Sequence, residues 1–190
     1  GMYWSSSNDF TEAMYYRLAQ AVSFSNSFIK NASELSGDEV NVFIAEARFL
    51  RAYAYYNLLD LYGNVPLTTE ISTELPTQSN RTELFNFIES ELMEIESTLL
   101  ASNEYGRVDN IAAHALLSRL YLNAEAWTGQ DRYADCVTYS QNVINSGYSL
   151  NMNDANGNGT AYDELFMADN DVNGAQNEFI FALNFDGMQS

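Results

Sequence analysis

Cysteine, proline, histidine and basic residues are all scarce in this chain of 190 residues. The single cysteine, Cys136, has no second cysteine with which to form an internal disulfide bond. Only 2 prolines are present, which suits a mostly helical body because proline breaks helices. The 8 Lys and Arg residues stand against 26 Asp and Glu residues, so the net charge is −18. Such a charge repels nucleic acid and anionic membrane surfaces, and we expect neither as a direct partner.

Long apolar runs are absent as well. No stretch approaches the roughly 20 apolar residues that a membrane-spanning helix needs. The first residues show neither the pattern of a signal peptide nor a cysteine that could carry a lipid.

The usual signatures of an active site are also missing. His114, the only histidine, falls in an Ala-rich and Leu-rich segment that is predicted to be a packed helix, with no Ser or Cys nucleophile motif to accompany it. There is no Gly-rich phosphate loop, no paired-cysteine metal pattern and no His-Glu-x-x-His. So acidic a chain has room for a pair of catalytic carboxylates, but nothing singles one out. We expect a protein that is not an enzyme.

Apolar residues make up 46% of the chain and recur at helical spacing. Residues 43–61 carry one apolar face at steps of three and four residues, with a second apolar face beside it. A helix that is apolar on two faces must be covered on both. We expect a mostly α fold, a tetratricopeptide-like scaffold of helix pairs with a minor β and loop portion at its C-terminal end. The expected helices cover about residues 8–31, 38–62, 80–100, 109–127 and 131–147. The inner face of the first helix should carry Phe10, Met14, Leu18, Ala21, Val22, Phe28 and Ile29.

Local signals mark the ends of several of these helices. Ser36 with Glu39, and Asn80 with Glu83, match the capping pattern in which an acidic residue follows a polar residue by three positions. Asp109 is a further candidate cap. Gly63 predicts the end of the second helix because glycine adopts the left-handed conformation that often follows a last turn.

The pattern changes after residue 150. Residues 151–159 are polar and rich in Gly and Asn, which predicts a loop. A short helix is expected at residues 162–166 and a strand at residues 177–185. We therefore divide the chain into a helical scaffold at residues 1–150 and a loop and short-strand segment at residues 151–190, which would lead into a portion missing from this chain.

Three ordered segments carry a resemblance to a known family. Residues 46–55 read Glu-Ala-Arg-Phe-Leu-Arg-Ala-Tyr-Ala-Tyr, and residues 63–67 follow as Gly-Asn-Val-Pro-Leu. Residues 106–122 and residues 133–150 provide the second and third matches. In these segments the chain resembles the SusD/RagB family, the surface glycan-binding lipoproteins of nutrient-uptake systems in Bacteroidetes.

The resemblance implies a function and a location. A family member of this kind binds glycans or oligosaccharides without cleaving them, on the outer face of the outer membrane. It delivers them to a TonB-dependent transporter, and its tetratricopeptide-like scaffold docks on that transporter. Family members are several hundred residues long and lipid-anchored, so we expect an internal part whose anchor lies outside this chain. A tetratricopeptide-like module that binds a protein or peptide is the alternative.

Tyr3 and Trp4 are the candidates for ligand binding. Most aromatic residues fall at helical spacing and belong to a core, but these two precede the first expected helix and are followed by short polar residues. Flat aromatic rings stack on the apolar faces of sugars, while nearby polar groups bind the hydroxyls. The resemblance agrees, because the family often has a glycan-contacting aromatic residue before this helix.

Two segments place oxygen-bearing side chains at alternate positions before a glycine. This spacing resembles the first half of a calcium loop. The closing Glu of such a loop should fall six residues after the glycine, where the sequence has Leu165 and Ile180. We expect ordinary Asx turns and no cofactor, with a weak calcium site as the alternative. The residues are Asp154, Asn156 and Asn158 in the first segment and Asp169, Asp171 and Asn173 in the second.

Half of the basic residues are four arginines that fall in or next to the expected helices. In so acidic a chain we expect them to neutralise buried or helix-terminal carboxylates, with anion binding as the alternative. Glu46 and Asp60 are the candidate partners, and the solvated face of the third helix should carry Glu91, Glu94 and Glu96. The arginines are Arg48, Arg51, Arg107 and Arg119.

Overall fold

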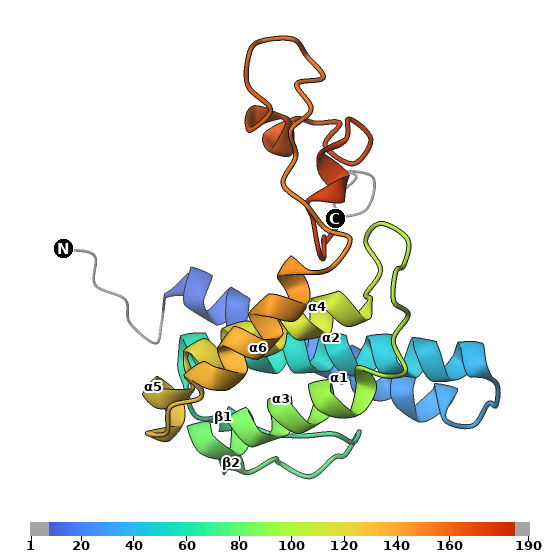
Figure 1. The fold of residues 1–190 in the computed structure, drawn as a ribbon. Coiled ribbons are helices and arrows are strands. Elements are labelled where there is room, and N and C mark those ends of the chain that lie inside the picture. The colour runs from blue at the N-terminus through green and yellow to red at the C-terminus, as the bar shows by residue number, and fades with distance from the viewer. Residues whose placement is uncertain (1–7, 185–190) are drawn as a thin grey trace.

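The computed structural model describes residues 8–184 and shows a mostly helical chain (Figure 1), as the sequence predicted. Two antiparallel strands of two residues each lie between the second and third helices and pair Val65 with Ser79. The described helices are α1 (Asp9–Ala32), α2 (Asp38–Tyr62), α3 (Arg81–Ile95), α4 (Asn110–Leu122), α5 (Ala124–Thr128) and α6 (Tyr133–Ile144), with strands β1 (Val65–Pro66) and β2 (Gln78–Ser79) and 3-10 helices η1 (Asp163–Phe166) and η2 (Ala175–Asn177).

Side chains at the helix ends explain most of these boundaries. The Asn80 side chain accepts a hydrogen bond from the Glu83 backbone and Glu83 reaches back to Asn80, which is the predicted capping box of α3. The capping box predicted at Ser36 is wrong, because α2 is capped by Gly37 without a side-chain hydrogen bond. Gly63 ends α2 with a φ of 75°, which favours glycine.

The predicted fourth helix is two helices. Asp109 caps α4 by accepting a hydrogen bond of 2.9 Å from the backbone of Ala112, as expected. The helix then breaks at Asn123, whose φ of −101° and ψ of 4° lie outside the helical region. The amide of Asn123 donates to the carbonyl of Arg119 at 3.0 Å, so its side chain competes with the backbone for that carbonyl.

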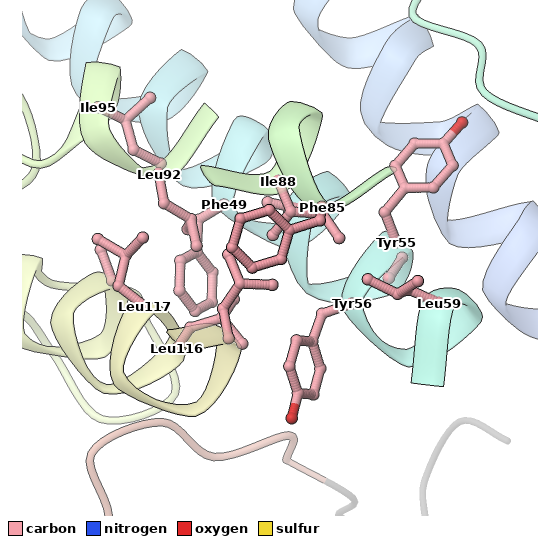
Figure 2. Packing of buried hydrophobic residues seen from close by; sticks show 14 of the residues in the cluster. Phe49, Tyr55, Tyr56, Leu59, Phe85, Ile88, Leu92, Ile95, Leu116 and Leu117 are labelled. Atoms are coloured by element: carbon pink, nitrogen blue, oxygen red, sulfur yellow. The ribbon is translucent and has the colours of Figure 1, made fainter. Parts of the chain in front are cut away.

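The two apolar faces of α2 are covered over most of their length, as its sequence predicted, although Leu50 and Leu61 are exposed. Figure 1 shows α2 between α1 and α3, while α4 and α6 form a second pair. Figure 2 shows Phe49 of α2 packed among buried side chains of α3 and α4, including Leu92 and Leu117. This shared core fixes the helices as one body.

The inner face of α1 differs from the expectation. Phe10, Met14 and Phe28 are exposed, so the expectation is wrong for these three of the seven residues. Leu18 and Ala21 are partly buried and pack against the core. Val22 is buried as predicted, together with the polar residue Asn26. Asn26 is buried because its side chain accepts a hydrogen bond from an arginine of the ion pair network described below.

Residues 145–184, named here the C-terminal lobe, project from the end of α6 (orange to red in Figure 1). The short helix expected at residues 162–166 is present as η1. The strand expected at residues 177–185 is wrong, because residues 178–184 form no strand. Among the described residues, no helix is both long enough and apolar enough to cross a membrane.

Candidate functional site

A buried ion pair network joins three helices of the scaffold, α1, α2 and α3. Glu91 of α3 accepts one hydrogen bond of 2.6 Å from Arg48 and another of 2.6 Å from Arg51, both on α2. Arg51 also donates to the Asn26 side chain of α1 at 2.7 Å. The hydrogen bond that Arg48 donates to Glu91 raises the pKa of the Arg48 guanidinium. The prediction that Glu91 lies on a solvated face is wrong, although Glu94 is exposed and pairs with Arg48 as well.

A second ion pair fixes the loop before α4, residues 101–107. Arg107 donates to Glu46 of α2 at 2.5 Å, which confirms Glu46 as an arginine partner. Asn103 donates to the same carboxylate oxygen at 3.0 Å. Arg119 instead lies 5.4 Å from the ring centre of Tyr56. Within residues 8–184 no ion pair involves Asp60, so the structure does not support its predicted role.

Residues 178–184, named here the strap, are the last part of the C-terminal lobe. They lie against the helical body where the lobe joins it. Phe181 packs edge-on against Phe49 and Tyr53, with ring centres 5.4 and 5.9 Å apart, where α2 and α4 form a groove. The Tyr148 hydroxyl donates to the buried carboxylate of Asp109 at 2.8 Å, and also reaches the strap backbone. Burial and the hydrogen bond to Asp109 raise the pKa of Tyr148. The strap is therefore held by apolar and polar contacts.

Between the loop of residues 101–107, η1 and the strap lies a hollow of about 810 Å³. Its volume falls within the range of about 300 to 1,000 Å³ that is usual for small-molecule sites. Tyr105 and Phe179 form one wall, with ring centres 6.5 Å apart. The other lining residues include Leu165, Asn170, Asp171, Phe181 and Asn184.

This hollow combines flat aromatic rings with amide and carboxylate groups. Aromatic rings present apolar faces, and Asn170, Asp171 and Asn184 supply hydrogen-bond donors and acceptors. Gly106 permits the close approach of Asn184, since a Cβ at residue 106 would lie 2.3 Å from the amide nitrogen of Asn184. This combination suits a ligand with both apolar faces and many hydroxyl groups.

Glu164 of η1 organises the loops beside the hollow. It is only 2% exposed. Its carboxylate accepts a hydrogen bond of 2.8 Å from the backbone of Asn156 and one of 2.9 Å from the side chain of Asn173. One buried carboxylate therefore joins the two segments that resembled calcium loops.

The contacts of the first of these segments are those of an Asx turn. The Asp154 carboxylate accepts hydrogen bonds from the backbones of Gly157 at 2.8 Å, Asn158 at 3.1 Å and Gly159 at 2.8 Å. The side-chain oxygen of Asn156 accepts from the backbone of Asn158 at 3.0 Å, and that of Asn158 accepts from the backbone of Thr160 at 3.0 Å. The oxygens expected to face a cation are thus engaged by the protein itself.

The second segment is built differently. The Asn173 side chain accepts a hydrogen bond of 2.9 Å from the backbone of Ala175, the first residue of η2. Asp171 lines the hollow, while the backbone carbonyl of Asp169 accepts from Asn173 at 3.0 Å. Across residues 8–184, His, Cys, Asp and Glu side chains form no group of three that could hold a metal ion.

The remaining candidate residues have different outcomes. Tyr3 and Trp4 lie outside the described residues, so their binding role stays a prediction. His114 lies 3.5 Å from the Glu96 carboxylate and packs edge-on against Tyr139 with ring centres 5.4 Å apart. These contacts join α3, α4 and α6 and fit a structural role.

The sequence did not point to the hollow. Its lining comes from segments far apart in the chain, and no periodic pattern marks Tyr105 or Asn184. The one available signal is the aromatic content of residues 179–185, and that pattern predicts a strand. The structure instead directs Phe179 to the hollow wall and Phe181 to both the hollow and the groove.

Comparison with known proteins identifies relatives over most of the chain. A SusD-like family described as "Starch-binding associating with outer membrane" matches residues 3–122. The chain is 39% identical over 98% of its length to the starch-binding protein SusD of Bacteroides thetaiotaomicron, of which it covers 33%. It therefore spans about a third of the length of this relative.

Solved structures share the fold. A SusD-like protein from Bacteroides fragilis superposes with a TM-score of 0.77 at 25% identity, over 96% of this chain and 35% of that protein. A laminarin-binding SusD-like protein superposes with a TM-score of 0.72 at 25% identity, over 85% of this chain and 36% of that protein.

Proposed function

Because the chain belongs to the SusD-like family, described as starch-binding and associating with the outer membrane, we propose that it binds glycans without cleaving them. The observation that carries the proposal is the hollow, in which Tyr105 and Phe179 stand beside Asn170, Asp171 and Asn184. Rings that stack on sugar faces and side chains that bind hydroxyls are what a glycan site requires.

The relatives support the choice of ligand. The protein from Bacteroides thetaiotaomicron is named for binding starch, and one of the solved relatives is named for binding laminarin. Both names refer to glucose polymers. We therefore propose oligosaccharides of this general kind as the first ligands to test.

The lining of the hollow argues for binding rather than hydrolysis. Glycosidases generally use two carboxyl groups placed on either side of the bond to be cleaved. Among the described residues that line the hollow, Asp171 is the one carboxylate. A single carboxylate can bind sugar hydroxyls but does not form such a pair.

The family also suggests a location and a partner. We propose that the protein acts on the outer face of the outer membrane and passes its ligand to a TonB-dependent transporter. In this proposal residues 1–150 form the scaffold that docks on the transporter, and residues 151–190 belong to the ligand-binding side. Tyr3 and Trp4, which precede α1, would add aromatic contacts to the glycan.

The peptide-binding alternative gains no support from the groove between α2 and α4. Phe181 of the strap packs there against Phe49 and Tyr53. A peptide that entered at this point would first have to displace a segment of the same chain. The exposed hollow beside the strap needs no such displacement.

Calorimetry with maltoheptaose and laminarihexaose tests the proposed function. Replacing Tyr105 by Ala should weaken binding about fivefold, since an aromatic contact contributes roughly 1 kcal/mol and 1.4 kcal/mol is tenfold in affinity. Tyr16→Ala is the matched control, because Tyr16 is an exposed tyrosine on α1. Trp4→Ala tests the predicted contact outside the described residues. Absence of binding to either glycan by the unmodified chain would overturn the proposal.

A further inference from the structure

We propose that Tyr162 and Phe166 form a second glycan contact, an exposed platform that stacks on the sugar rings of a neutral chain extending beyond the hollow. This inference rests on the proposed glycan binding. It adds a second set of contacts at the other side of η1 and restricts the class of ligand to neutral glycans.

The two rings are paired and largely open to solvent. Tyr162 is 70% exposed and Phe166 is 72% exposed. Their ring centres lie 5.4 Å apart, and the ring planes meet at 64°. Exposed apolar side chains are common singly, but two adjacent aromatic rings offer a continuous surface of the kind that marks binding sites. The rings together present two angled faces to a ligand.

The backbone that carries these rings is held firmly. Glu164 lies between them in sequence, is buried, and accepts hydrogen bonds from Asn156 and Asn173 on either side. The Asn170 side chain donates to the backbone carbonyl of Leu165 at 2.8 Å. The platform is therefore fixed by its supporting loops before any ligand arrives, and such preorganisation reduces the cost of binding.

The platform adjoins the hollow. Leu165 lines the hollow, whereas the rings of Tyr162 and Phe166 are not part of its lining. Leu165 directly precedes Phe166, so the residue that lines the hollow and the residue that carries one platform ring have Cα atoms only about 3.8 Å apart. A glycan of several units bound in the hollow can thus extend across η1 onto the platform.

The charge of this region selects among glycans. Residues 133–190 contain no Lys, Arg or His. The residues around the platform include the carboxylates of Asp154, Asp163 and Asp169. Negative charge of this density repels uronic acid and sulfated chains, while stacking on an aromatic ring requires no charge on the sugar. The ligand that fits is a neutral pyranose chain.

The test measures how affinity depends on chain length. Three proteins are compared by calorimetry: the unmodified 190-residue chain, the double variant Tyr162→Ala and Phe166→Ala, and the control Phe10→Ala. Each protein is titrated with a short and a long oligosaccharide of two series, maltotriose and maltoheptaose, and laminaritriose and laminarihexaose. Phe10 is an exposed aromatic residue of α1, so Phe10→Ala removes one exposed ring away from the lobe. Equal melting temperatures establish that the variants are folded.

We expect the double variant to weaken binding of the longer oligosaccharide about tenfold and to leave the trisaccharide unchanged. The Phe10→Ala control should bind the trisaccharide and the longer oligosaccharide with the same affinity as the unmodified chain. Polygalacturonate should not bind. Binding of the hexamer or heptamer that is unchanged in the double variant, while Tyr105→Ala still weakens it, overturns this inference and leaves the proposed function standing.

Other results separate the two proposals further. An equal loss for short and long oligosaccharides would place the rings in the primary site and overturn the second contact. Binding of polygalacturonate as tight as that of a neutral chain would overturn the ligand class. If the unmodified chain binds neither glucan series, both the inference and the proposed function fail.

Discussion

Removing the charge of Glu91 is the sharpest test of how the scaffold is held. Glu91 accepts hydrogen bonds from Arg48 and Arg51, and the side chains of Glu91 and Arg51 are only 9% and 6% exposed. In Glu91→Gln the shape is kept, but Arg51 remains as a buried cation whose polar partners, Asn26 and the amide at position 91, are both neutral. Breaking one partner of a buried pair costs about 3 to 5 kcal/mol. We expect a loss of this size.

The assay is urea unfolding followed by circular dichroism at pH 7. The transition midpoint should fall while the slope with urea stays constant, because the same surface is exposed on unfolding. For a chain of this length, each kcal/mol lowers the melting temperature by about 2 to 4 °C. The matched control is Glu94→Gln, which removes an ion pair to Arg48 from a side chain that is 63% exposed. Exposed pairs contribute about 0 to 1 kcal/mol.

Equal losses in Glu91→Gln and Glu94→Gln would refute the reasoning, because burial would then make no difference. A double variant with Arg51→Met and Glu91→Leu adds a second check. Replacing both charged groups by apolar ones removes the unpaired cation, so its stability should recover toward that of the unmodified chain. A double variant as unstable as Glu91→Gln would show that the loss comes from packing.

Three further predictions concern the C-terminal lobe. Phe181→Ala should lower the free energy of unfolding by about 2 kcal/mol, below the range for fully buried rings because Phe181 is half-buried, and should speed proteolysis of the strap; unchanged cleavage would contradict this. Because burial and Asp109 raise the pKa of Tyr148, its phenol should ionise above about pH 10, the usual value, in an ultraviolet titration. That contribution to stability is complete below pH 10 and is lost as the pH rises through the raised pKa, and Asp109→Asn should lower that pKa. Since backbone amides engage Asp154, EDTA should leave the melting temperature unchanged, whereas a rise with calcium would support the alternative of a cation site.

Local signals in the sequence were enough to place most helices. The caps at Asn80 and Asp109 and the stop at Gly63 depend on residues within a few positions of one another, so their effect can be predicted without knowing the fold. Gly37 shows the limit of such signals. Its neighbour Ser36 fits the capping pattern, but the cap residue in the structure has no side chain to make the hydrogen bond.

Contacts between distant residues could not be predicted in this way. Glu91 pairs with Arg51, 40 positions away, and only the packing of α2 against α3 decides that it faces inward. The spacing of Glu91, Glu94 and Glu96 by itself fits a solvated face equally well. The break at Asn123 is likewise invisible, since Leu120 and Ala124 continue the apolar pattern across it.

The strand predicted at residues 177–185 failed for a related reason. Alternating aromatic residues predict a strand because one face of a sheet is buried. Here Phe179 faces Tyr105 and Phe181 faces Phe49 and Tyr53, so two different surfaces bury the alternate side chains. Without a neighbouring strand to supply hydrogen bonds, the same pattern gives an extended strap.

The strap connects the scaffold to the proposed site through its aromatic residues. Phe181 contacts α2 at Phe49 and Tyr53 and also lines the hollow, so the helical core positions one wall of the hollow directly. Changes in the groove between α2 and α4 should therefore alter glycan affinity although no residue of α2 lines the hollow. Tyr53→Ala provides the case to examine. It removes one of the two rings that hold Phe181, and we expect weaker glycan binding with only a modest loss of stability, because Phe49 stays in place. Unchanged affinity in a folded Tyr53→Ala variant would show that the hollow is positioned by the lobe alone.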